Sequence, residues 1–450
     1  MSTLLLRARE IDLGGVALFR FISLFAGFGA NVLAIAVLSR QHGASEYAAF
    51  ALVASLVNLL PFADLGLGAS IVNATSDRSA GKLSRGQFRH QVSKARDWMI
   101  IFMLILSGFT ALAYYVVSFD PLLGNLSGTP GIDEATAYTF ACIACSIPLG
   151  LGGRVLQGLG RMIDVVRMGL VGPVIQVCIY VPLMIMDAPP YAYFWGPGTA
   201  YLATAATGYW LARRRHGLRM NLPFSALFSG SAQGPSLWRT AAPFLIVSVG
   251  MTIGFQSHRI LLSHFGSPQS VAEYSLVAQF LGPLLAVTGV VGQNLWARYR
   301  RDLHDNSLSP ASYKNHLMIF VFIGLFFAIA LVFIAAPAAD LVSGAQVSPP
   351  LLLILGAGSY LVVTAIHQPS AMLLNDSKGL WFQAACVVLV ATTTVALIIF
   401  SVPYLGAAAP YLCMSACMFV LQVIPSIRMA YRRINQQSSP SRNQARFSLR

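Results

Sequence analysis

The sequence predicts an all-α polytopic membrane protein, with twelve transmembrane helices in two six-helix bundles around a central cavity. Three observations support this fold class. Of the 450 residues, 56% are hydrophobic and only 10% are charged, whereas a soluble domain carries about 25% charged residues. Long apolar stretches recur along the whole chain, and the basic residues gather in alternate connecting segments.

Transmembrane helices are expected wherever about 20 mostly apolar residues follow one another, because this length crosses the hydrocarbon core. Twelve stretches qualify, at residues 14–38, 46–74, 97–118, 136–156, 165–187, 191–212, 239–264, 272–297, 316–338, 349–374, 380–402 and 406–430. They divide the chain into a cytoplasmic N-terminus (1–13), a first bundle (14–212), a cytoplasmic linker (213–238), a second bundle (239–430) and a basic cytoplasmic tail (431–450).

The basic residues set the expected orientation. Apart from Arg20, Arg40 and Arg259, every Lys and Arg falls in the N-terminus, in or beside the even-numbered loops, or in the tail. By the positive-inside rule, both termini then face the cytoplasm. The net charge of +14 is therefore explained by topology, with anionic membrane lipids as expected partners and no nucleic acid.

Other features of the chain narrow the function classes. The N-terminus has no cleavage motif, so no signal peptide is expected. The six cysteines lie in apolar runs and are expected to be small buried residues rather than a disulfide framework or a metal site. The longest external loop covers about residues 118–136, so no domain outside the membrane is expected to carry enzymatic chemistry.

Two segments half a chain apart resemble each other. Residues 38–60 and 262–285 both begin with Leu-Ser, reach a Glu-Tyr pair (Glu46-Tyr47 and Glu273-Tyr274) and continue into a long apolar helix. Six predicted spans separate the copies, so the halves should share one orientation. Alternating access by rocking of two such halves is the expected motion.

Several short motifs follow one another in a fixed order. They are Gly43 and Tyr47, the run Asp64-Leu65-Gly66-Leu67-Gly68, the element LQGLGR at Leu156 to Arg161, and the segments HRILLSHFG and VAEYSLVAQFL. Together they resemble the Wzx-type polysaccharide and O-antigen flippases of the multidrug/oligosaccharidyl-lipid/polysaccharide (MOP) exporter superfamily. The resemblance covers nearly the whole chain, and it depends on the order and spacing of the motifs.

The resemblance implies a location in the bacterial inner membrane and the transfer of undecaprenyl-diphosphate-linked oligosaccharide to the periplasmic leaflet. A lipid-linked oligosaccharide is then the expected substrate, and a polysaccharide polymerase and a chain-length regulator are expected partners. One position departs from the pattern. Relatives commonly carry Asp-Arg or Asp-Lys in the seventh span where this chain has His258-Arg259, which puts an ion-pair role there in doubt.

Charged residues inside the spans are costly and mark a cavity or an ion path. Arg20 in the first span and Asp64 in the second lie at similar expected depths. We assign Arg20 to the substrate diphosphate, because a guanidinium fork suits phosphate oxygens, and Asp64 to the support of Arg20. A purely structural pair, or an Arg20 that snorkels to the headgroups, is the alternative. Arg154 and Arg259 are further candidates for diphosphate contact, although snorkelling also explains Arg154.

Two histidines are candidates for coupling to an ion gradient. His258 lies beside Arg259, and His367 precedes Pro369 in the tenth span. A buried, hydrogen-bonded His367 beside a proline kink is the simpler interpretation, whereas proton coupling is the functional one. No catalytic residue, metal or cofactor is expected, and a proton or Na⁺ gradient is the candidate driving force.

Three other functions compete with the flippase. A cation-coupled multidrug (MATE-like) antiporter is the main alternative, but it should carry more carboxylates inside the membrane. A membrane polymerase or ligase should present a large external loop. A lipid II flippase typically has fourteen spans, and the count of twelve argues against it.

Overall fold

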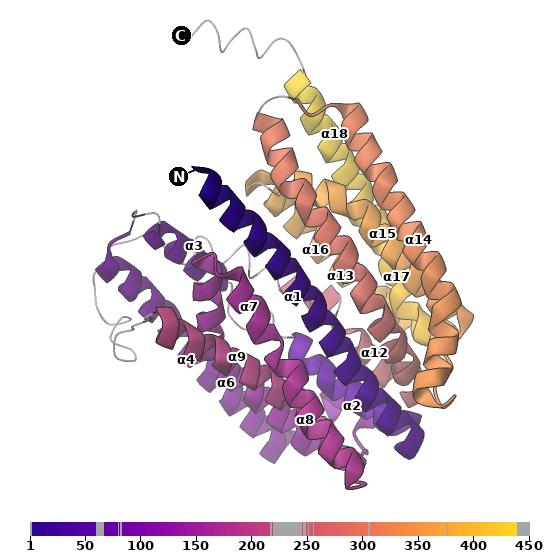
Figure 1. Cartoon of the computed structure of the whole chain (residues 1–450). Helices are drawn as coiled ribbons and strands as arrows, with labels where there is room; N and C mark the ends of the chain where they lie inside the picture. The colour runs from indigo at the N-terminus through magenta and orange to yellow at the C-terminus, as the bar shows by residue number, and fades with distance from the viewer. Residues whose placement is uncertain are drawn as a thin grey trace, which may run out of the picture. The chain divides into compact units, whose positions relative to one another are not determined.

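The computed structural model describes residues 2–59, 67–79, 81, 83–216, 218, 245, 249–250, 252–254, 256–304, 307–375 and 377–438. Throughout these residues the regular structure is helical, without a strand (Figure 1). The predicted all-α fold class is therefore confirmed. The chain divides into two compact units, Met1–Thr252 and Ile253–Arg450. The predicted linker lies largely outside the described residues, so the predicted domain limits stay a prediction.

In the first unit, α6 is the central helix. The helices are α1 (Ser2–Val37), α2 (Ala44–Leu56), α3 (Leu67–Ser79), α4 (Arg85–Leu112), the short α5 (Asp120–Leu123), α6 (Ile132–Gly158), α7 (Met162–Gly169), α8 (Val171–Ile185) and α9 (Trp195–His216). Helix α6 contacts α9, α4 and α3, and it also meets α2 and α7. Helices α2, α3, α4, α7 and α9 therefore pack on α6, whereas α1 and α8 pack mainly on α7, on α9 and on each other.

In the second unit, α15 has the corresponding central place. The helices are α12 (His258–Phe265), α13 (Pro268–His304), α14 (Pro310–Ser343), α15 (Leu351–Leu373), α16 (Ser377–Leu405), α17 (Ala409–Met418) and α18 (Ile424–Ser438). Helix α15 contacts α14, α13, α17 and α18. Short π-helical turns extend or join helices within each unit. They lie at Leu38–His42 and Ala113–Val117 in the first unit and at Phe419–Val423 in the second.

Eight helical segments in the described part of the chain are long and apolar enough to cross a membrane. The last segment, Lys378–Gln436, has 59 residues and contains both predicted spans after residue 379. Predicted span 191–212 is helical as α9, and span 46–74 is helical as α2 and α3, with 60–66 outside the described residues. Span 239–264 is described in part, at 245, 249–250, 252–254 and 256–264, and its end is α12. The other predicted spans each coincide with one of the eight segments.

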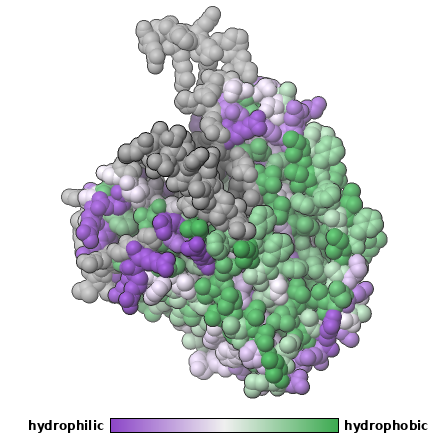
Figure 2. All heavy atoms as spheres, in the orientation of Figure 1, coloured by the Kyte–Doolittle hydropathy of each residue, from purple (hydrophilic) through white to green (hydrophobic). Residues whose placement is uncertain are grey.

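The surface of the helices suits an apolar solvent. On α14, Phe322, Phe326 and Phe333 are 65%, 68% and 74% exposed and lie on one side of the helix. Figure 2 shows that hydrophobic residues dominate the face on which α14 lies. Cys145 and Cys178 are exposed as well, so the prediction that all six cysteines are buried is wrong for these two. Within a bilayer, a small apolar side chain leaves water without being buried in protein.

The third predicted span begins too late in the sequence. Helix α4 starts at Arg85, not at residue 97, because Ser84 and Gln87 form a capping box. The Ser84 hydroxyl accepts from the Gln87 backbone N–H at 3.2 Å, and the Gln87 side chain accepts from the Ser84 N–H at 3.0 Å. This pairing satisfies two backbone donors at the helix start. The basic segment assigned to a loop is therefore helical from Arg85 onward.

The earlier start of α4 brings an ion pair into the helix interior. The Arg96 Nε and Nη2 groups donate to Asp97 Oδ1 at 3.0 and 2.5 Å. The Arg96 side chain is 10% exposed and that of Asp97 is 0% exposed, and the pair is surrounded in sequence by Val92, Ala95 and Met99 of the hydrophobic core. Removing one partner of such a pair leaves an uncompensated buried charge.

The two segments that resemble each other in sequence share a local structure. Each forms a helix, a glycine-containing turn (Gly43 or Gly266) and a second helix that carries the Glu-Tyr pair near its start. Both tyrosines are buried, with Tyr47 1% exposed and Tyr274 5% exposed. The repeat therefore extends to the order of helix, turn and helix, whereas the turns themselves differ, with φ of 92° at Gly43 and −114° at Gly266.

Close helix packing in the first unit depends on a glycine. A Cβ atom at Gly152 in α6 would lie 2.3 Å from the Cα of Tyr209 in α9, whereas a Cβ at Gly150 would meet nothing within 4 Å. Small residues at helix contacts allow backbones to approach closely, which favours association within membranes. The α6–α9 contact therefore has no room for a side chain at position 152.

We expect Gly152→Ala to destabilise the protein, because the added methyl group must push α6 and α9 apart. Overpacking of this kind typically costs about 1–3 kcal/mol. The thermal unfolding midpoint of the purified protein in detergent should therefore fall clearly. Gly150→Ala is the matched control on the same helix and should leave the midpoint nearly unchanged. Equal midpoints for the two variants would show that the α6–α9 contact does not limit stability.

We expect Asp97→Asn to lower the same midpoint, because the buried Arg96 guanidinium then loses the negative charge of the Asp97 acceptor. Breaking a buried pair costs about 3–5 kcal/mol, and an exposed pair is worth about 0–1 kcal/mol. The control is Asp302→Asn, since Asp302 pairs with Arg298 at 3.6 Å in a partly exposed position. A loss at Asp302 as large as the loss at Asp97 would contradict the structural role of the buried pair.

Candidate functional site

In the first unit, three arginines lie at or beside the residues through which α1, α6 and α7 pack on one another. The guanidinium carbon of Arg167 in α7 lies 4.8 Å from the ring centroid of Phe19 in α1, a distance typical of a cation–π contact. Arg20 follows Phe19 directly and is exposed. The contact between α1 and α7 therefore involves Phe19 and Arg167, and Arg20 is the next residue of α1.

A second packing contact brings α6 to the same level. A Cβ at Gly153 in α6 would lie 2.9 Å from the Cε of Met168 in α7, so these two residues touch. Arg154 follows Gly153 and Arg167 precedes Met168, and both arginines are exposed. We call Arg20, Arg154 and Arg167 the arginine group. It combines two predicted substrate-binding residues, Arg20 and Arg154, with Arg167, which the sequence placed only among the basic cytoplasmic residues.

The LQGLGR element ends α6 and starts α7. The Arg161 N–H donates to the Leu156 carbonyl and the Gly160 N–H to the Gln157 carbonyl, both at 3.0 Å. Gly160 has a φ of 73°, the left-handed conformation that glycine adopts at such helix ends. Arg161 Nε then donates to Asp164 Oδ2 at 3.0 Å. The motif therefore sets the helix break that places Arg154 and Arg167 on adjacent helices.

In the second unit, Arg259 is held by a hydroxyl and an aromatic ring. Its Nε donates to Ser275 Oγ in α13 at 2.8 Å, and its guanidinium carbon lies 5.8 Å from the Tyr274 ring centroid. Both partners lie in α13, where Tyr274 belongs to the Glu-Tyr pair and Ser275 follows it. Helix α13 begins with Pro268, and a missing N–H is tolerated at the first position of a helix. Among the described residues Arg259 is thus oriented without a carboxylate, as its departure from the flippase pattern suggests.

His258 lies in an aromatic cluster beside Arg259. The side chain is 3% exposed, and its Nδ1 lies 2.8 Å from the Tyr274 hydroxyl. Tyr411 of α17 stacks on Tyr274 with ring centroids 4.7 Å apart, and Tyr360 of α15 stacks on Tyr411 at 5.8 Å. In the part of the chain that the structure describes, His258 Nε2 is buried without a hydrogen-bond partner. The aromatic cluster therefore buries one polar nitrogen atom, His258 Nε2.

His367 lies in α15, one residue before Gln368 and two before Pro369. The side chain is 8% exposed, and its Nε2 is buried with no hydrogen-bond partner among the described residues. The simpler prediction of a hydrogen-bonded histidine is therefore not met at this nitrogen. Asp64, the predicted support of Arg20, lies outside the described residues. Within those residues, no group of His, Cys, Asp or Glu has the arrangement of a metal site.

Sequence reasoning identified Arg20, Arg154, Arg259, His258 and His367, but the structure brings only some of them together. Arg20 and Arg154 belong to the first unit, whereas the other three belong to the second. Arg167 was not among the predicted site residues, and the Arg96–Asp97 pair was not predicted as a buried contact. The spacing of Arg161, Asp164 and Arg167 on one short helix was the available signal for Arg167.

Comparison with known proteins gives matches of structure only. No family model and no curated protein matches the chain. The inward-facing conformation of a multidrug resistance MATE family transporter of the MOP superfamily superposes with a TM-score of 0.68, at 13% identity, over 94% of this chain and 99% of that one. Lipid II flippase MurJ, in an inward closed conformation, gives a TM-score of 0.67 at 12% identity, over 94% of this chain and 89% of that one.

An outward-facing conformation of a MATE family transporter of the MOP superfamily gives a TM-score of 0.55 at 13% identity, over 95% of this chain and 99% of that one. At such low identities the similarity concerns the fold, and it extends over nearly the full length of each structure. In its described residues the chain therefore has an all-helical fold similar to that of the MATE transporter and MurJ structures, with several helices apolar and long enough to cross a membrane.

Proposed function

We propose that this protein flips a lipid-linked oligosaccharide across the bacterial inner membrane, and that the lipid carrier is undecaprenyl diphosphate. The observation that carries the proposal is the arginine group. Three exposed guanidinium groups come from α1, α6 and α7 near one level of the first unit. Guanidinium groups bind phosphate oxygens in pairs of parallel hydrogen bonds, so the arginine group suits a diphosphate.

The position of Arg20 along its helix supports contact with a headgroup. At about 1.5 Å per residue, Arg20 lies about 33 Å from His42 at the far end of the helix that α1 and its π-helical turn form. The hydrocarbon core is about 30 Å thick. With the N-terminus in the cytoplasm, Arg20 therefore lies at the level of the cytoplasmic headgroups, shallower than the sequence suggested. A lipid diphosphate in that leaflet lies at the same level.

Arg259 is proposed to contact the diphosphate later in the transport cycle. It lies about 9 Å from Phe265, the end of α12, and by the positive-inside rule this end faces the periplasm. Its hydroxyl and aromatic partners fix the guanidinium without neutralising it. Rocking of two bundles would expose first the arginine group and then Arg259 to the lipid headgroup.

A cation-coupled multidrug antiporter is the alternative, because MATE transporters share the fold. Such a protein would be expected to hold carboxylates in mid-membrane. From Phe19 onward, the acidic side chains of the described segments lie within about two turns of a helix end or are paired, as Asp97 and Asp164 are. This charge distribution favours an anionic substrate. A polysaccharide polymerase and a chain-length regulator are the proposed partners in exopolysaccharide, O-antigen or capsule synthesis.

We expect Arg20→Ala combined with Arg167→Ala to reduce the flipping of a fluorescent polyprenyl-diphosphate oligosaccharide in proteoliposomes by at least about tenfold. Each lost guanidinium removes charge-assisted hydrogen bonds that are worth about 1.5–3 kcal/mol. The control is the double change Arg213→Ala and Arg214→Ala, which removes two exposed charges from the end of α9. Normal flipping by the Arg20/Arg167 variant at equal protein level would exclude the arginine group as the diphosphate site.

We expect the gradient dependence of transport to depend on His367, because its buried Nε2 has no partner in the described chain and an imidazole nitrogen can bind and release a proton. In proteoliposomes, an inward proton gradient should accelerate flipping by the wild type, and His367→Gln should abolish this acceleration. His264→Gln is the control, since His264 Nδ1 lies 2.8 Å from the Ile260 carbonyl of its own helix. Acceleration that persists in the His367 variant, or that follows a Na⁺ gradient alone, would contradict proton coupling through this residue.

A further inference from the structure

A groove rich in basic residues lies within the second unit between α16 and α18. We call it the basic groove. It has a volume of about 840 Å³, and its cationic lining residues are Lys378 on α16 and Arg428, Arg432 and Arg433 on α18. None of its lining residues in the described chain is acidic. Four cations gathered in one groove repel one another, so that an anion bound there would be stabilised.

The groove combines basic and apolar residues on both helices. On α16, Phe382 lies one turn beyond Lys378, farther from the helix start. On α18, Arg432 and Arg433 lie toward the helix end, and Arg428 lies one turn earlier, between Pro425 and Met429. Both walls therefore carry charged and apolar side chains next to one another. A ligand that fits both parts has an anionic head and an apolar body, as a membrane lipid has.

The wall formed by α18 is fixed by its packing. Ala430 and Ile434 are fully buried in a cluster with Tyr299 and Tyr313, and the ring of Tyr431 lies 5.1 Å from that of Tyr313, edge to face. Because successive residues are about 100° apart around a helix, Arg428 and Arg432 lie opposite this buried face, and both are exposed. The packing of α18 therefore fixes the backbone that carries Arg428 and Arg432 before any ligand binds.

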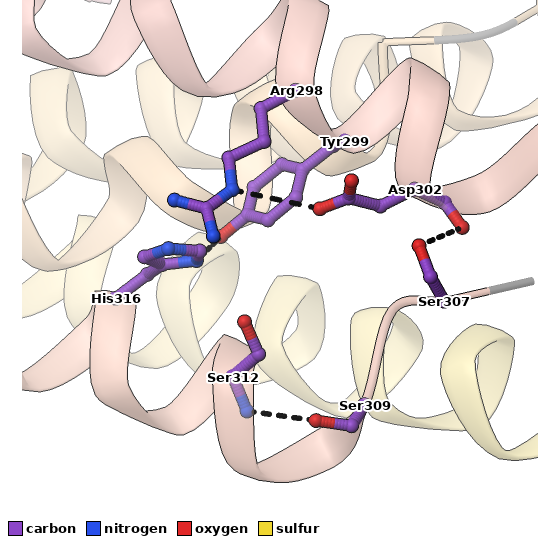
Figure 3. A network of polar contacts seen from close by, with 7 residues as sticks. All are labelled: Arg298, Tyr299, Asp302, Ser307, Ser309, Ser312 and His316. Carbon is purple, nitrogen blue, oxygen red and sulfur yellow. Dashed lines mark hydrogen bonds and ion pairs between the residues drawn. The ribbon is translucent and has the colours of Figure 1, made fainter. Parts of the chain in front are cut away.

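Polar contacts around the groove fix the neighbouring helix ends. Arg433 Nη1 donates to the Leu373 carbonyl at the end of α15, at 3.5 Å, which satisfies a carbonyl that the helix itself leaves open. Figure 3 shows the adjoining turn from α13 to α14, where the Tyr299 hydroxyl lies 3.0 Å from His316 Nδ1. There Asp302 pairs with Arg298, on the same helix.

We propose that the basic groove binds an anionic phospholipid that carries two phosphate groups, of the diphosphatidylglycerol class. By the positive-inside rule this end of the unit lies at the cytoplasmic leaflet, where basic pockets between helices bind such headgroups. Cations on two separate walls match two phosphates that a glycerol bridge holds apart. This site is independent of the transported substrate, because it involves neither the arginine group nor Arg259.

The test is a titration of the purified, delipidated full-length protein with diphosphatidylglycerol in detergent, with the thermal unfolding midpoint as readout. The test variant combines Lys378→Gln, Arg428→Gln and Arg432→Gln, and it keeps Arg433 because Arg433 caps α15. We expect the wild type to be stabilised by the lipid and the variant to bind on the order of tenfold more weakly or worse. The matched control combines Arg85→Gln, Lys94→Gln and Lys314→Gln, three exposed basic residues elsewhere.

Full stabilisation of the control but not of the test variant would support the site. An unchanged response of the test variant would overturn it, and so would an equal loss in the control, which would indicate general surface charge. Phosphatidylglycerol at equal total charge, inorganic pyrophosphate and a short isoprenyl diphosphate complete the comparison. A response to any of these as strong as the response to diphosphatidylglycerol would overturn the assignment to a phospholipid with two separated phosphates.

Discussion

The contact between α6 and α9 is the constraint on which the first unit depends. Gly152 lets the two backbones approach so closely that a methyl group there would collide with Tyr209. From this position α6 contacts α3, α4 and α7, and its last turn ends in the glycine cap of the LQGLGR element. Because association in a bilayer relies on packing rather than on the exclusion of water, a side chain at position 152 would disturb the packing of α6, the helix that carries Arg154.

The two units repeat a scaffold but differ in chemistry. Each has a helix, a glycine-containing turn and a buried tyrosine after a glutamate. When the two Leu-Ser pairs are aligned, His258 and Arg259 of the second unit correspond to Ala34 and Ile35 of the first. The second unit thus has a hydrogen-bonded aromatic and cationic cluster where the first has apolar packing, with Ala34 and Ile35 both buried. The cations of the first unit come from other helices, so a shared scaffold carries different polar groups in its two copies.

The fold could be predicted from the sequence because hydropathy and the distribution of Lys and Arg report the membrane directly. Side-chain positions could be predicted less well. Arg96 and Asp97 were assigned near a loop because a hydropathy window ignores helix caps, although Ser84 and Gln87 carried that signal. Arg167 could not be joined to Arg20 without knowing that Phe19 packs beneath it. Arg20 lies in a helix that extends back to Ser2, beyond the apolar run in the sequence, so its depth in the membrane stays a prediction. Asp64, prominent in the sequence, lies outside the described residues.

The proposed function depends on the chemistry of the transported molecule. The most direct measurement reconstitutes the purified wild-type protein into liposomes and follows the transfer of a fluorescent polyprenyl-diphosphate oligosaccharide between leaflets by dithionite quenching, beside the uptake of a cationic drug. The account predicts transfer of the diphosphate-linked lipid that an unlabelled lipid of the same class competes away, and no gradient-driven uptake of the cation. Uptake of the cation together with an unmoved lipid would contradict it and identify the protein as an antiporter.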